Sequence, residues 1–350
     1  MLHILCNHVT YRAQCGYIRY CAGKSTKGLK RSMKILITGA FGNLGLMCVD
    51  RALALGYDVR CFDVCTKKNQ KIAQQYGNRI ETFFGDIRDS YRLKNVVKGV
   101  DGIIHNASIL PPLTESNPKF SKDVNVEGTR CLISCAEVEN PLMRFIFPSS
   151  VTVFGFPSLN EVPRTVLDSV EPTDNYTDHK LTCETMLKES QLEWCVLRVG
   201  VSVDSRTLRT DWATFKKLLQ VRADNPLEYV HPKDVAFAMC QALIAEDAPK
   251  KVLLIGGGQD CQITQKHFLG VAMSACGLTL DSDAFGQDAF YTHWMNTEES
   301  QRILQYQAHD VSDYLNEMQV ALRRVRILLT PVRPIVNMVF RNVMKSLARK

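Results

Sequence analysis

The chain has 350 residues, 45% of them hydrophobic, which is enough to bury a large α/β core and a smaller second lobe. Its net charge of +7 is unevenly spread, because residues 1–32 hold six Lys or Arg, residues 321–350 hold eight, and neither segment holds an acidic residue. Residues 33–320 are therefore net acidic, which argues against a nucleic-acid-binding body, and no apolar run has the length of a membrane span.

Residues 1–32 allow two interpretations. Met33 stands directly before the first strand-like segment and is a candidate for the true start of the chain. Otherwise residues 1–32 form a disordered basic extension, with mitochondrial targeting as the lesser alternative, because they contain no apolar run of signal-peptide length. Their cysteines and histidines lack the paired spacing of a structural zinc site, so no metal site is predicted.

The most informative segment is KILITGAFGNLG at residues 34–45, where an apolar strand leads through three glycines into a helix. Gly39 permits the sharp turn, Gly42 lets the backbone approach a pyrophosphate, and Gly45 lets the helix pack close to the strand. The pattern predicts a dinucleotide site. The cofactor-binding residues expected in this turn are Gly39, Phe41, Gly42, Asn43, Leu44 and Gly45.

The next strand, YDVRCFD at residues 57–63, ends in Asp63 about 20 residues after the glycines, where a ribose hydroxyl needs an acceptor. A carboxylate there repels the 2′-phosphate of NADP unless a nearby Arg offsets its charge. Arg60 is the only close candidate, and alternation along the strand places it on the opposite side from Asp63. NAD is therefore the expected cofactor, and NADP is less favoured.

Strand-like and helix-like segments alternate along the chain. Strands are predicted near residues 34–38, 58–63, 79–84, 101–105, 143–148, 194–199 and 251–255. The longest helices are predicted near residues 117–138 and 174–190. This order predicts an α/β fold of the Rossmann type, a doubly wound parallel sheet with right-handed crossovers and helices on both faces.

The predicted organisation has four parts. They are the extension at 1–32, an NAD-binding domain at 33–199 with returning segments near 229–255, a smaller interleaved substrate lobe at 200–320, and a basic amphipathic tail at 321–350. The thirteen cysteines have no repeating spacing, which indicates a reducing cytoplasm. Those that fall in predicted elements, and are expected to act as small apolar groups, are Cys61, Cys131, Cys135, Cys183, Cys195 and Cys240.

Tyr176 and Lys180 in YTDHK lie four residues apart, after Ser149 and Ser150 at the end of a predicted strand. Helical spacing puts Tyr176 and Lys180 on one face, so the ammonium can lower the pKa of the phenol from about 10 and can bind a cofactor ribose. The Ser150 hydroxyl can then bond the substrate oxygen while Tyr176 moves its proton. A surface helix pair is the alternative, but both groups are expected at the carboxyl edge of the sheet, where such folds bind ligands.

Further ordered motifs extend over most of residues 33–307. With Asp63, they are TGAFGNLG (38–45), GDIRD (85–89), HNAS (105–108), NVEGT (125–129), SSVTVFG (149–155), YTDHK (176–180), LRVG (197–200), YVHPKDVA (229–236) and NTEESQRILQYQ (296–307). In these motifs the chain resembles the extended short-chain dehydrogenase/reductase family, the NAD-dependent epimerase/dehydratase group.

The resemblance implies Ser150 as the hydroxyl partner, Tyr176 as the acid/base and Lys180 as the ribose ligand. The further cofactor-binding residues that it implies are Asp86, Ile87, Ala107, Ser108, Asn125 and Val199. Two local alternatives stay open, since Asp86 can cap the next helix and Asn125 can satisfy buried backbone groups.

The chain departs from the family pattern where the substrate is expected. Phe154 stands where many members carry Tyr, Val199 replaces a common Pro, and the segment at 200–230 is short, which puts the usual nucleotide-sugar pocket in question. The substrate-contact candidates are Arg198, Arg206, Arg209, Trp212 and His231, with solvated side chains as the alternative.

The end of the tail, IVNMVFRNVMKSLARK at 335–350, repeats apolar residues at helical spacing with basic residues largely elsewhere around the helix. Such a helix can lie on an anionic membrane surface. The alternative is that its apolar stripe packs on the body or on another subunit.

Three functional hypotheses follow. The first is an NAD-dependent oxidoreductase of the epimerase or dehydratase type that acts on a nucleotide sugar by Tyr-assisted hydride transfer. The second is a hydroxysteroid or other lipid dehydrogenase or reductase at a membrane surface, and the third is a non-catalytic NAD(P)-bound structural or regulatory subunit. We expect a small-molecule substrate, a homodimer, no nucleic-acid partner and a cytoplasmic location, with peripheral membrane contact through 335–350 as the variant.

Overall fold

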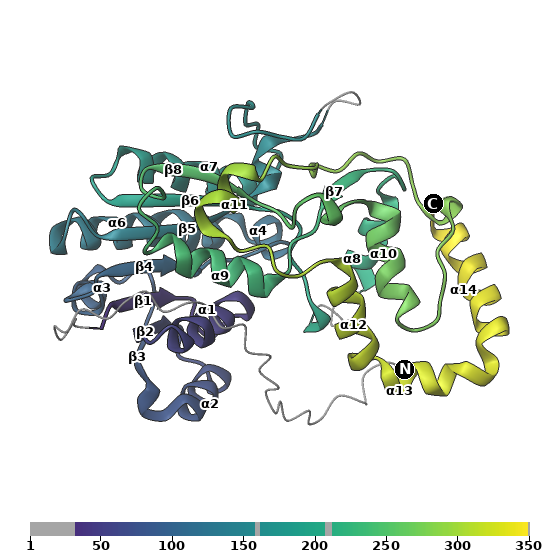
Figure 1. The fold of residues 1–350 in the computed structure, drawn as a ribbon, viewed down its shortest axis with the longest axis horizontal. Coiled ribbons are helices and arrows are strands. Elements are labelled where there is room, and N and C mark those ends of the chain that lie inside the picture. Colours follow the sequence, from purple (N-terminus) through teal and green to yellow (C-terminus); the bar gives the residue numbers. More distant parts are fainter. Residues whose placement is uncertain (1–31, 158–161, 207–211, 349–350) are drawn as a thin grey trace. The chain divides into compact units, whose positions relative to one another are not determined.

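A computed structural model describes residues 32–157, 162–206 and 212–348 (Figure 1). Two sequence predictions therefore lie outside the described residues. They are the basic extension at 1–32, whose last residue, Ser32, alone is described, and the substrate candidate Arg209.

Seven parallel strands form one sheet in the order β3-β2-β1-β4-β5-β6-β8. Their bounds are β1 Lys34–Thr38, β2 Asp58–Asp63, β3 Ile80–Phe84, β4 Gly102–His105, β5 Arg144–Ser150, β6 Glu193–Val199 and β8 Lys251–Ile255. Each lies within about two residues of its predicted bounds, and the prediction of a doubly wound parallel sheet is confirmed. The strand order reverses between β1 and β4, which is where folds of this kind bind their ligands.

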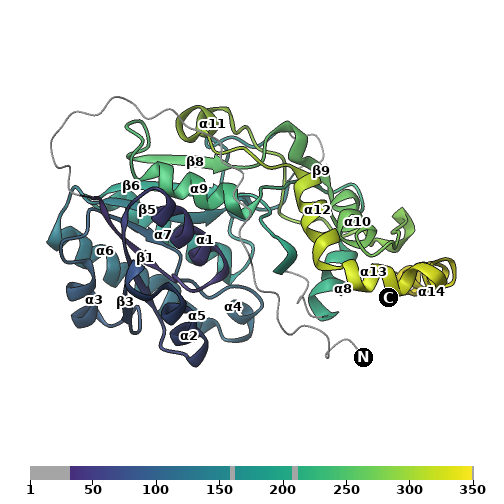
Figure 2. The same ribbon diagram turned by 60° about the horizontal axis from the view of Figure 1, so that its bottom comes forward.

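Helices cover both faces of the sheet (Figures 1 and 2). Those on one face are α1 Asn43–Ala54, α2 Lys67–Tyr76, α9 Pro232–Ala242 and α11 Glu298–Leu304. Those on the other are α3 Ser90–Val97, α6 Gly128–Glu139 and α7 Asn175–Glu189. In β1, Ile35 and Ile37 pack with the first set and Leu36 with the second, as the two-residue period of a strand requires.

The long helix predicted at 117–138 is interrupted. It consists of α5 Pro118–Lys122, a π-helical turn at Asp123–Glu127 and then α6, and the short helix α4 Leu113–Ser116 precedes it. The wider turn accompanies side-chain bonds from Asn125 to the backbone of Ile109, so the interruption coincides with a residue of the predicted site. The other long helix, predicted at 174–190, is α7.

A smaller lobe is built from residues beyond β6. It contains α8 Trp212–Gln220, the antiparallel pair β7 Pro226–Glu228 and β9 Gln262–Thr264, α10 Gln265–Ser274 and α12 Val311–Ala321. The tail continues as α13 Arg323–Leu329 and α14 Arg333–Ala348. Phe340 and Met344 of α14 join the core of this lobe, and Lys345 and Asp283 pair at 2.6 Å, so one face of the tail packs on the body.

The described cysteines are all free thiols. Of the six predicted to act as apolar groups, Cys61, Cys135, Cys183, Cys195 and Cys240 are buried, whereas Cys131 is partly exposed. None of the helices in the described ranges combines the length and the apolarity that crossing a bilayer requires.

Candidate active site

The glycine turn between β1 and α1 has the geometry of a dinucleotide cradle. Gly39 adopts a φ of +62°, and a Cβ at this position would lie 2.7 Å from the backbone nitrogen of Ala107 after β4. A Cβ at Gly45 would collide with the carbonyl oxygen of Gly39. Because α1 has no side-chain cap and no acid in its first turn, its leading N–H groups are available to a phosphate.

Asp63 lies at the end of β2, beside this turn. Its carboxylate accepts the backbone N–H of Phe41 at 2.8 Å and that of Val64 at 2.7 Å. Burial raises the pKa of Asp63, and these two hydrogen bonds and the charge of Lys68 offset part of the rise. The carboxylate predicted to bind the ribose is therefore fixed to the same backbone that would cradle the phosphates.

Arg60 points away from Asp63, as the strand alternation predicts. Its guanidinium bonds Glu81 at 2.7 Å and the carbonyls of Val96 and Lys98 at 2.6 and 2.8 Å. Lys68 in α2 was not among the predicted residues, and its charge lowers the pKa of Asp63. Arg60 is engaged elsewhere, so it is not placed to offset a 2′-phosphate.

Asp86 and Ile87 follow β3. Asp86 pairs with Arg88 at 2.6 Å, and this pairing holds the pKa of the Asp86 carboxyl below its usual range. Asp86 does not cap α3, because the N-terminal cap of that helix is Asp89. Ile87 is a buried core residue that packs against Gly128, so its side chain braces the loop from inside.

Asn125 holds the loop that follows β4. Its side chain accepts the N–H of Ile109 at 2.7 Å, donates to the Ile109 carbonyl at 2.9 Å, and lies 3.3 Å from His179 Nδ1 of α7. Asn125 therefore satisfies buried backbone groups, as the local alternative for this residue predicted. It also links the loop with α7. A cavity of about 10 Å³ lies here, lined by Ala107, Ser108, Asn125, Thr129, Phe147, His179, Lys180 and Cys183.

The three predicted catalytic residues converge at the carboxyl edge of the sheet. Ser150 ends β5, and its hydroxyl accepts the Thr152 hydroxyl at 2.8 Å. Tyr176 and Lys180 lie on α7, whose start is fixed by Asp174 in a capping box. The Lys180 ammonium donates to the Pro148 carbonyl at 2.7 Å and lies 5.6 Å from the centre of the Tyr176 ring.

The pKa of Tyr176 differs from the value expected from the sequence. Burial raises the pKa of Tyr176 to about 12, and hydrogen bonding to Ser150 offsets only part of this rise. Burial also lowers the pKa of Lys180 to about 8. The expected lowering of the Tyr176 pKa by Lys180 is absent, because the ammonium is directed to the Pro148 carbonyl rather than to the phenol.

A buried ionic network connects α7 with β5 and β6. The Glu184 carboxylate of α7 accepts the hydroxyl of Ser149 at 2.6 Å and the guanidinium of Arg198 in β6 at 2.8 and 3.1 Å. These bonds hold the pKa of Glu184 below its usual range despite its burial. Arg198 also stacks on Phe154 at 4.8 Å, so this substrate candidate is engaged in structure and Phe154 packs in the core.

The other substrate candidates are separated from one another. Arg206 bonds Asp204 at 2.8 Å and the carbonyl of Asn43 at 3.1 Å, so it ties the segment after β6 to α1. His231 is fully buried, accepts the Lys233 N–H and stacks on His309. The site therefore does not bring Arg198, Arg206 and His231 together around a ligand. Trp212 is exposed on α8 and stacks on Phe215, and Val199 is half-buried at the end of β6.

Apolar side chains that were not predicted from the sequence lie on segments that contact α7 or its cap residue Asp174. The Tyr291 hydroxyl donates to Asp174 at 2.9 Å, next to Tyr176, and the Tyr291 ring contacts Phe156 at 5.7 Å. Leu113 begins α4, which contacts α7. Leu110, Leu113 and Phe156 are exposed. Only their aromatic and aliphatic character was visible in the sequence, because their elements are far apart along the chain.

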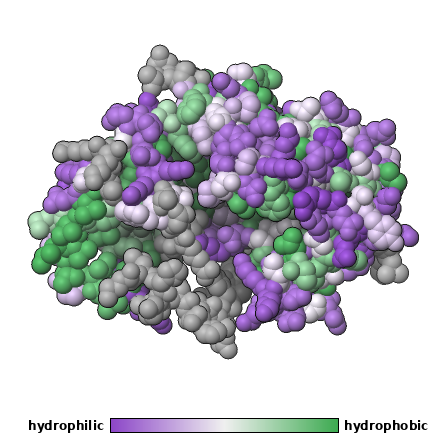
Figure 3. All heavy atoms as spheres, turned by 180° about the vertical axis from the view of Figure 1, so that it is seen from behind, coloured by the Kyte–Doolittle hydropathy of each residue, from purple (hydrophilic) through white to green (hydrophobic). Residues whose placement is uncertain are grey.

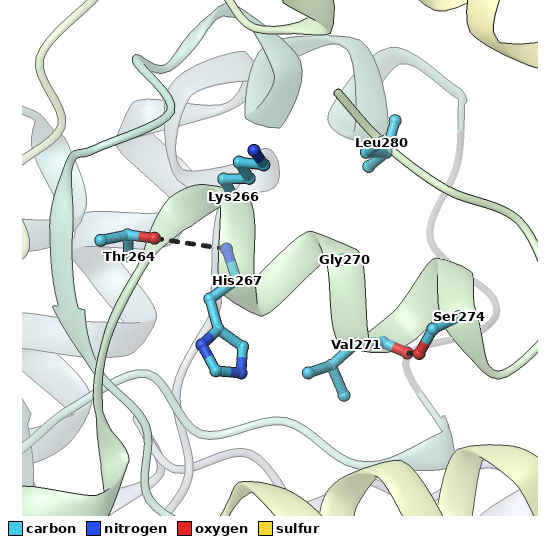
Figure 4. Close-up of a pocket in the computed structure, with 7 residues that line it drawn as sticks. All are labelled: Thr264, Lys266, His267, Gly270, Val271, Ser274 and Leu280. Carbon is cyan, nitrogen blue, oxygen red and sulfur yellow. Dashed lines mark hydrogen bonds between the residues drawn. The ribbon is translucent and has the colours of Figure 1, made fainter. Parts of the chain in front are cut away.

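A second hollow lies on the smaller lobe, along α10 (Figure 4). Its volume is about 390 Å³, and it is lined by Thr264, Lys266, His267, Gly270, Val271, Ser274 and Leu280. Thr264 caps α10 by accepting the backbone N–H of His267 at 3.3 Å. No predicted catalytic residue lines this hollow.

Comparisons with known proteins agree with this geometry. The model of the 3-beta hydroxysteroid dehydrogenase/isomerase family matches residues 36–196. D-erythronate dehydrogenase of Haemophilus influenzae is 30% identical over 164 residues, which are 45% of this chain and 50% of that protein. The chain thus spans about half the length of this relative. UDP-glucose 4-epimerase of Klebsiella pneumoniae is 33% identical over 131 residues, which are 35% of this chain and 93% of that protein.

Solved structures share the fold. UDP-glucuronic acid 4-epimerase from Bacillus cereus, in complex with UDP-glucuronic acid and NAD, superposes with a TM-score of 0.70 at 20% identity. The match covers 84% of this chain and 100% of that one. Together with the sheet order, the glycine turn and the Ser150, Tyr176 and Lys180 arrangement, these likenesses show that the chain belongs to the extended short-chain dehydrogenase/reductase family, the NAD-dependent epimerase/dehydratase group.

Proposed function

We propose that this chain binds NAD and interconverts a secondary alcohol and a ketone on a substrate with an apolar ring system. The observation that carries the proposal is the apolar character of segments that contact α7, the helix of Tyr176: Leu113 begins α4, which contacts α7, and Tyr291 bonds the cap residue Asp174 and contacts Phe156. Arg198 and Arg206, the described cations proposed for a substrate, are engaged with Glu184 and Asp204. The steroid-dehydrogenase family match supports this substrate class.

The residues that would hold NAD fit the group. Gly39 and Gly45 leave no room for a Cβ, the start of α1 offers N–H groups to the pyrophosphate, and Asp63 offers an acceptor to the adenosine ribose. Contacts with Asp86, Ile87, Ala107, Ser108 and Val199 remain proposals. When bound, the nicotinamide supplies a hydride acceptor or donor.

Residues of the chain itself would transfer the proton of the substrate hydroxyl. In the oxidation direction Tyr176 Oη removes the proton of the substrate hydroxyl, and Ser150 Oγ donates a hydrogen bond to the same oxygen. The Lys180 ammonium, which the Pro148 carbonyl holds in place, is the proposed donor to the nicotinamide ribose. In the reduction direction Tyr176 returns its proton, and its raised pKa keeps that proton available at neutral pH.

A nucleotide sugar is the second candidate substrate. It is favoured by the 33% identity to UDP-glucose 4-epimerase and by the shared fold of the UDP-glucuronic acid complex. Here Tyr176 would play the same part on a sugar hydroxyl, and Arg209 is a candidate for the diphosphate.

The test incubates purified full-length protein with NAD and either a 3β-hydroxysteroid or a UDP-sugar, with NADH absorbance and product analysis as readouts. Turnover of the steroid that Tyr176→Phe abolishes is the expected result. Turnover of UDP-sugars alone would replace the proposal with the second candidate. Tight NAD binding without turnover of either panel, together with unchanged cellular function of Tyr176→Phe, would favour a non-catalytic subunit.

A homodimer and a cytoplasmic location are retained as proposals from the sequence. Sedimentation velocity of the purified chain measures the first, and microscopy of the tagged chain measures the second.

A further inference from the structure

Helix α14 is apolar on two opposite faces. Phe340 and Met344 pack into the core of the smaller lobe, and the ion pairs of Arg341 with Asp281 and of Lys345 with Asp283 fix this orientation. The opposite face carries Ile335, Met338, Val339 and Val343, which are 45% to 63% exposed. Because the buried face is fixed in this way, rotation of the helix cannot cover the second one.

The exposed stripe continues onto the preceding helix. Ile327 and Leu328 of α13 are 61% and 68% exposed, and Val325 and Val332 are also exposed. Figure 3 shows hydrophobic side chains gathered at the end of the molecule where α13 and α14 lie. Contiguous apolar surface of this kind, unlike scattered single residues, marks an interaction site. We name the exposed side chains of α13, α14 and the turn between them, Val325, Ile327, Leu328, Val332, Ile335, Met338, Val339 and Val343, the tail patch.

The helices that carry the tail patch have only basic charged residues. Arg323, Arg324 and Arg326 of α13 are exposed, and the ion pairs found in the described part of the chain do not include them. Residues 321–350 contain eight basic and no acidic residues. The surface therefore combines uncovered aliphatic side chains with unneutralised guanidinium groups, which matches the acyl boundary and the headgroups of an anionic bilayer.

We propose that the tail patch docks on an anionic lipid surface, with α13 and α14 lying in the plane of the interface. The main competing occupant is the same patch of a second copy. A two-fold interface would place Arg323, Arg324 and Arg326 of one chain near the same residues of the other, and this like-charge contact would be unfavourable. Anionic headgroups instead attract each of these arginines.

The experiment is vesicle flotation of the full chain. We expect co-flotation with phosphatidylcholine vesicles that contain phosphatidylserine and little with phosphatidylcholine alone. Ile335→Gln/Val339→Gln/Val343→Gln should abolish flotation. Arg323→Gln/Arg324→Gln/Arg326→Gln should lower partitioning on the order of a hundredfold, since each basic residue near such a surface contributes about fivefold.

Matched controls use exposed residues of the same types elsewhere. Tyr91→Gln/Val138→Gln/Leu142→Gln removes three exposed apolar side chains, and Lys94→Gln/Lys98→Gln/Lys119→Gln removes three exposed cations. Both should float like the parent. NAD binding by each tail variant, followed by fluorescence, verifies that its sheet domain is folded.

Three results would overturn the proposal. One is no flotation of the parent with phosphatidylserine vesicles, and another is flotation that needs the arginines but not the apolar residues. The third is a dimer in sedimentation velocity that the apolar variant dissociates while vesicle binding is unchanged, because the tail patch would then be a contact between copies. These readouts do not depend on turnover, so they stand apart from the test of the substrate.

Discussion

Lys180 is a buried cation for which we propose a functional role. Its ammonium donates to the Pro148 carbonyl and lies 4.7 Å from the centre of the Phe147 ring. The lowered pKa, from 10.5 to about 8, means that the folded state penalises the charged form. Retaining such a residue makes physical sense where its charge and donors serve a bound ligand.

Replacing Lys180 by Met should therefore abolish turnover and raise stability. The pKa shift corresponds to about 3 kcal/mol of penalty below pH 8, from which the lost bond to Pro148 subtracts about 1 kcal/mol. We expect the free energy of unfolding to rise by a net amount of about 2 kcal/mol at pH 7. This gain should shrink as pH rises from about 8 towards 10.5. Urea denaturation at pH 7 and pH 10 measures it. Lys94→Met, at an exposed position of α3, should change neither quantity, and destabilisation at pH 7 would contradict the reasoning.

The two directions of the reaction should respond differently to pH. Alcohol oxidation needs Tyr176 as a base, and with a pKa of about 12 its rate should rise about tenfold per unit between pH 6 and pH 8. Above pH 8 the slope should flatten, because Lys180 loses there the charge with which it is proposed to bind the cofactor ribose. Ketone reduction uses protonated Tyr176 and should stay flat below pH 8. Initial rates in both directions across this range measure the effect, and identical profiles would count against Tyr176 as the proton carrier.

Among the helices and strands, α7 is held in place by one carboxylate. Glu184 connects it to β5 through Ser149 and to β6 through Arg198. Ser150 ends β5, and Tyr176 and Lys180 belong to α7, so the spacing between the hydroxyl partner and the acid/base depends on this buried network.

Glu184→Gln should lower the free energy of unfolding by about 3 kcal/mol, because it leaves the buried Arg198 charge without a counter-ion. Misplacement of Tyr176 relative to Ser150 should reduce kcat more than it raises KM. Denaturant titration and steady-state kinetics measure both. Glu189→Gln, at an exposed position of the same helix, is the control. Recovery of stability but not of kcat in Glu184→Leu/Arg198→Met would separate charge burial from positioning.

The glycine turn offers a matched pair of substitutions. Gly39 and Gly56 both have positive φ, but a Cβ at Gly39 meets the backbone after β4 whereas one at Gly56 meets nothing within 4 Å. Gly39→Ala should therefore abolish NAD binding by displacing Ala107, while Gly56→Ala should cost only about 1 kcal/mol of backbone strain. Calorimetric titration with NAD and denaturant melts measure these outcomes. Equal NAD affinity in both variants would contradict the prediction that the turn at Gly39 binds NAD.

Local sequence pattern was sufficient to predict these helices and strands. It was insufficient to predict which side chains pair between them. The strands around Ile37 and Cys61 and the helix from Tyr176 were predictable, because strand alternation and helical spacing are properties of neighbouring residues. The pairing of Glu184 with Arg198 depends on how α7 packs on β6, which no short window contains. The approach of Tyr291 to Phe156 likewise depends on the path of the chain over the sheet edge, and burial decided the pKa of Tyr176 against the expected effect of Lys180.

At the scale of the whole described chain, α9 of the sheet domain is joined to α12 of the smaller lobe by a cluster of titratable groups. His309 bonds Asp234 at 2.6 Å, and Glu317 lies 2.6 Å from Lys233 and 3.4 Å from His231. The pairing raises the pKa of His309 and lowers that of Glu317 to about 2.

Glu317→Gln should destabilise the protein at pH 7 by about 1 kcal/mol, since Glu317 is partly exposed and its pairs are screened. A lowered folded pKa stabilises above the unfolded value of about 4.5 and loses this effect as pH falls towards 2, so the difference from the parent should shrink below pH 4.5. Guanidinium titrations at pH 7 and pH 3.5 measure it, with exposed Glu246→Gln as control. A difference that grows on acidification would contradict the assignment.

The bond from Arg206 to the carbonyl of Asn43 joins the start of the substrate lobe to the first turn of α1. The phosphate end of the proposed cofactor site and the segment after β6 consequently share a side chain, and we predict that cofactor and substrate binding are thermodynamically linked through it. Linkage is reciprocal, and whatever factor NAD contributes to substrate affinity, substrate must contribute to NAD affinity. Breaking the bond with Arg206→Met should therefore reduce this factor for both ligands equally, and the enzyme would then tend towards random rather than ordered addition.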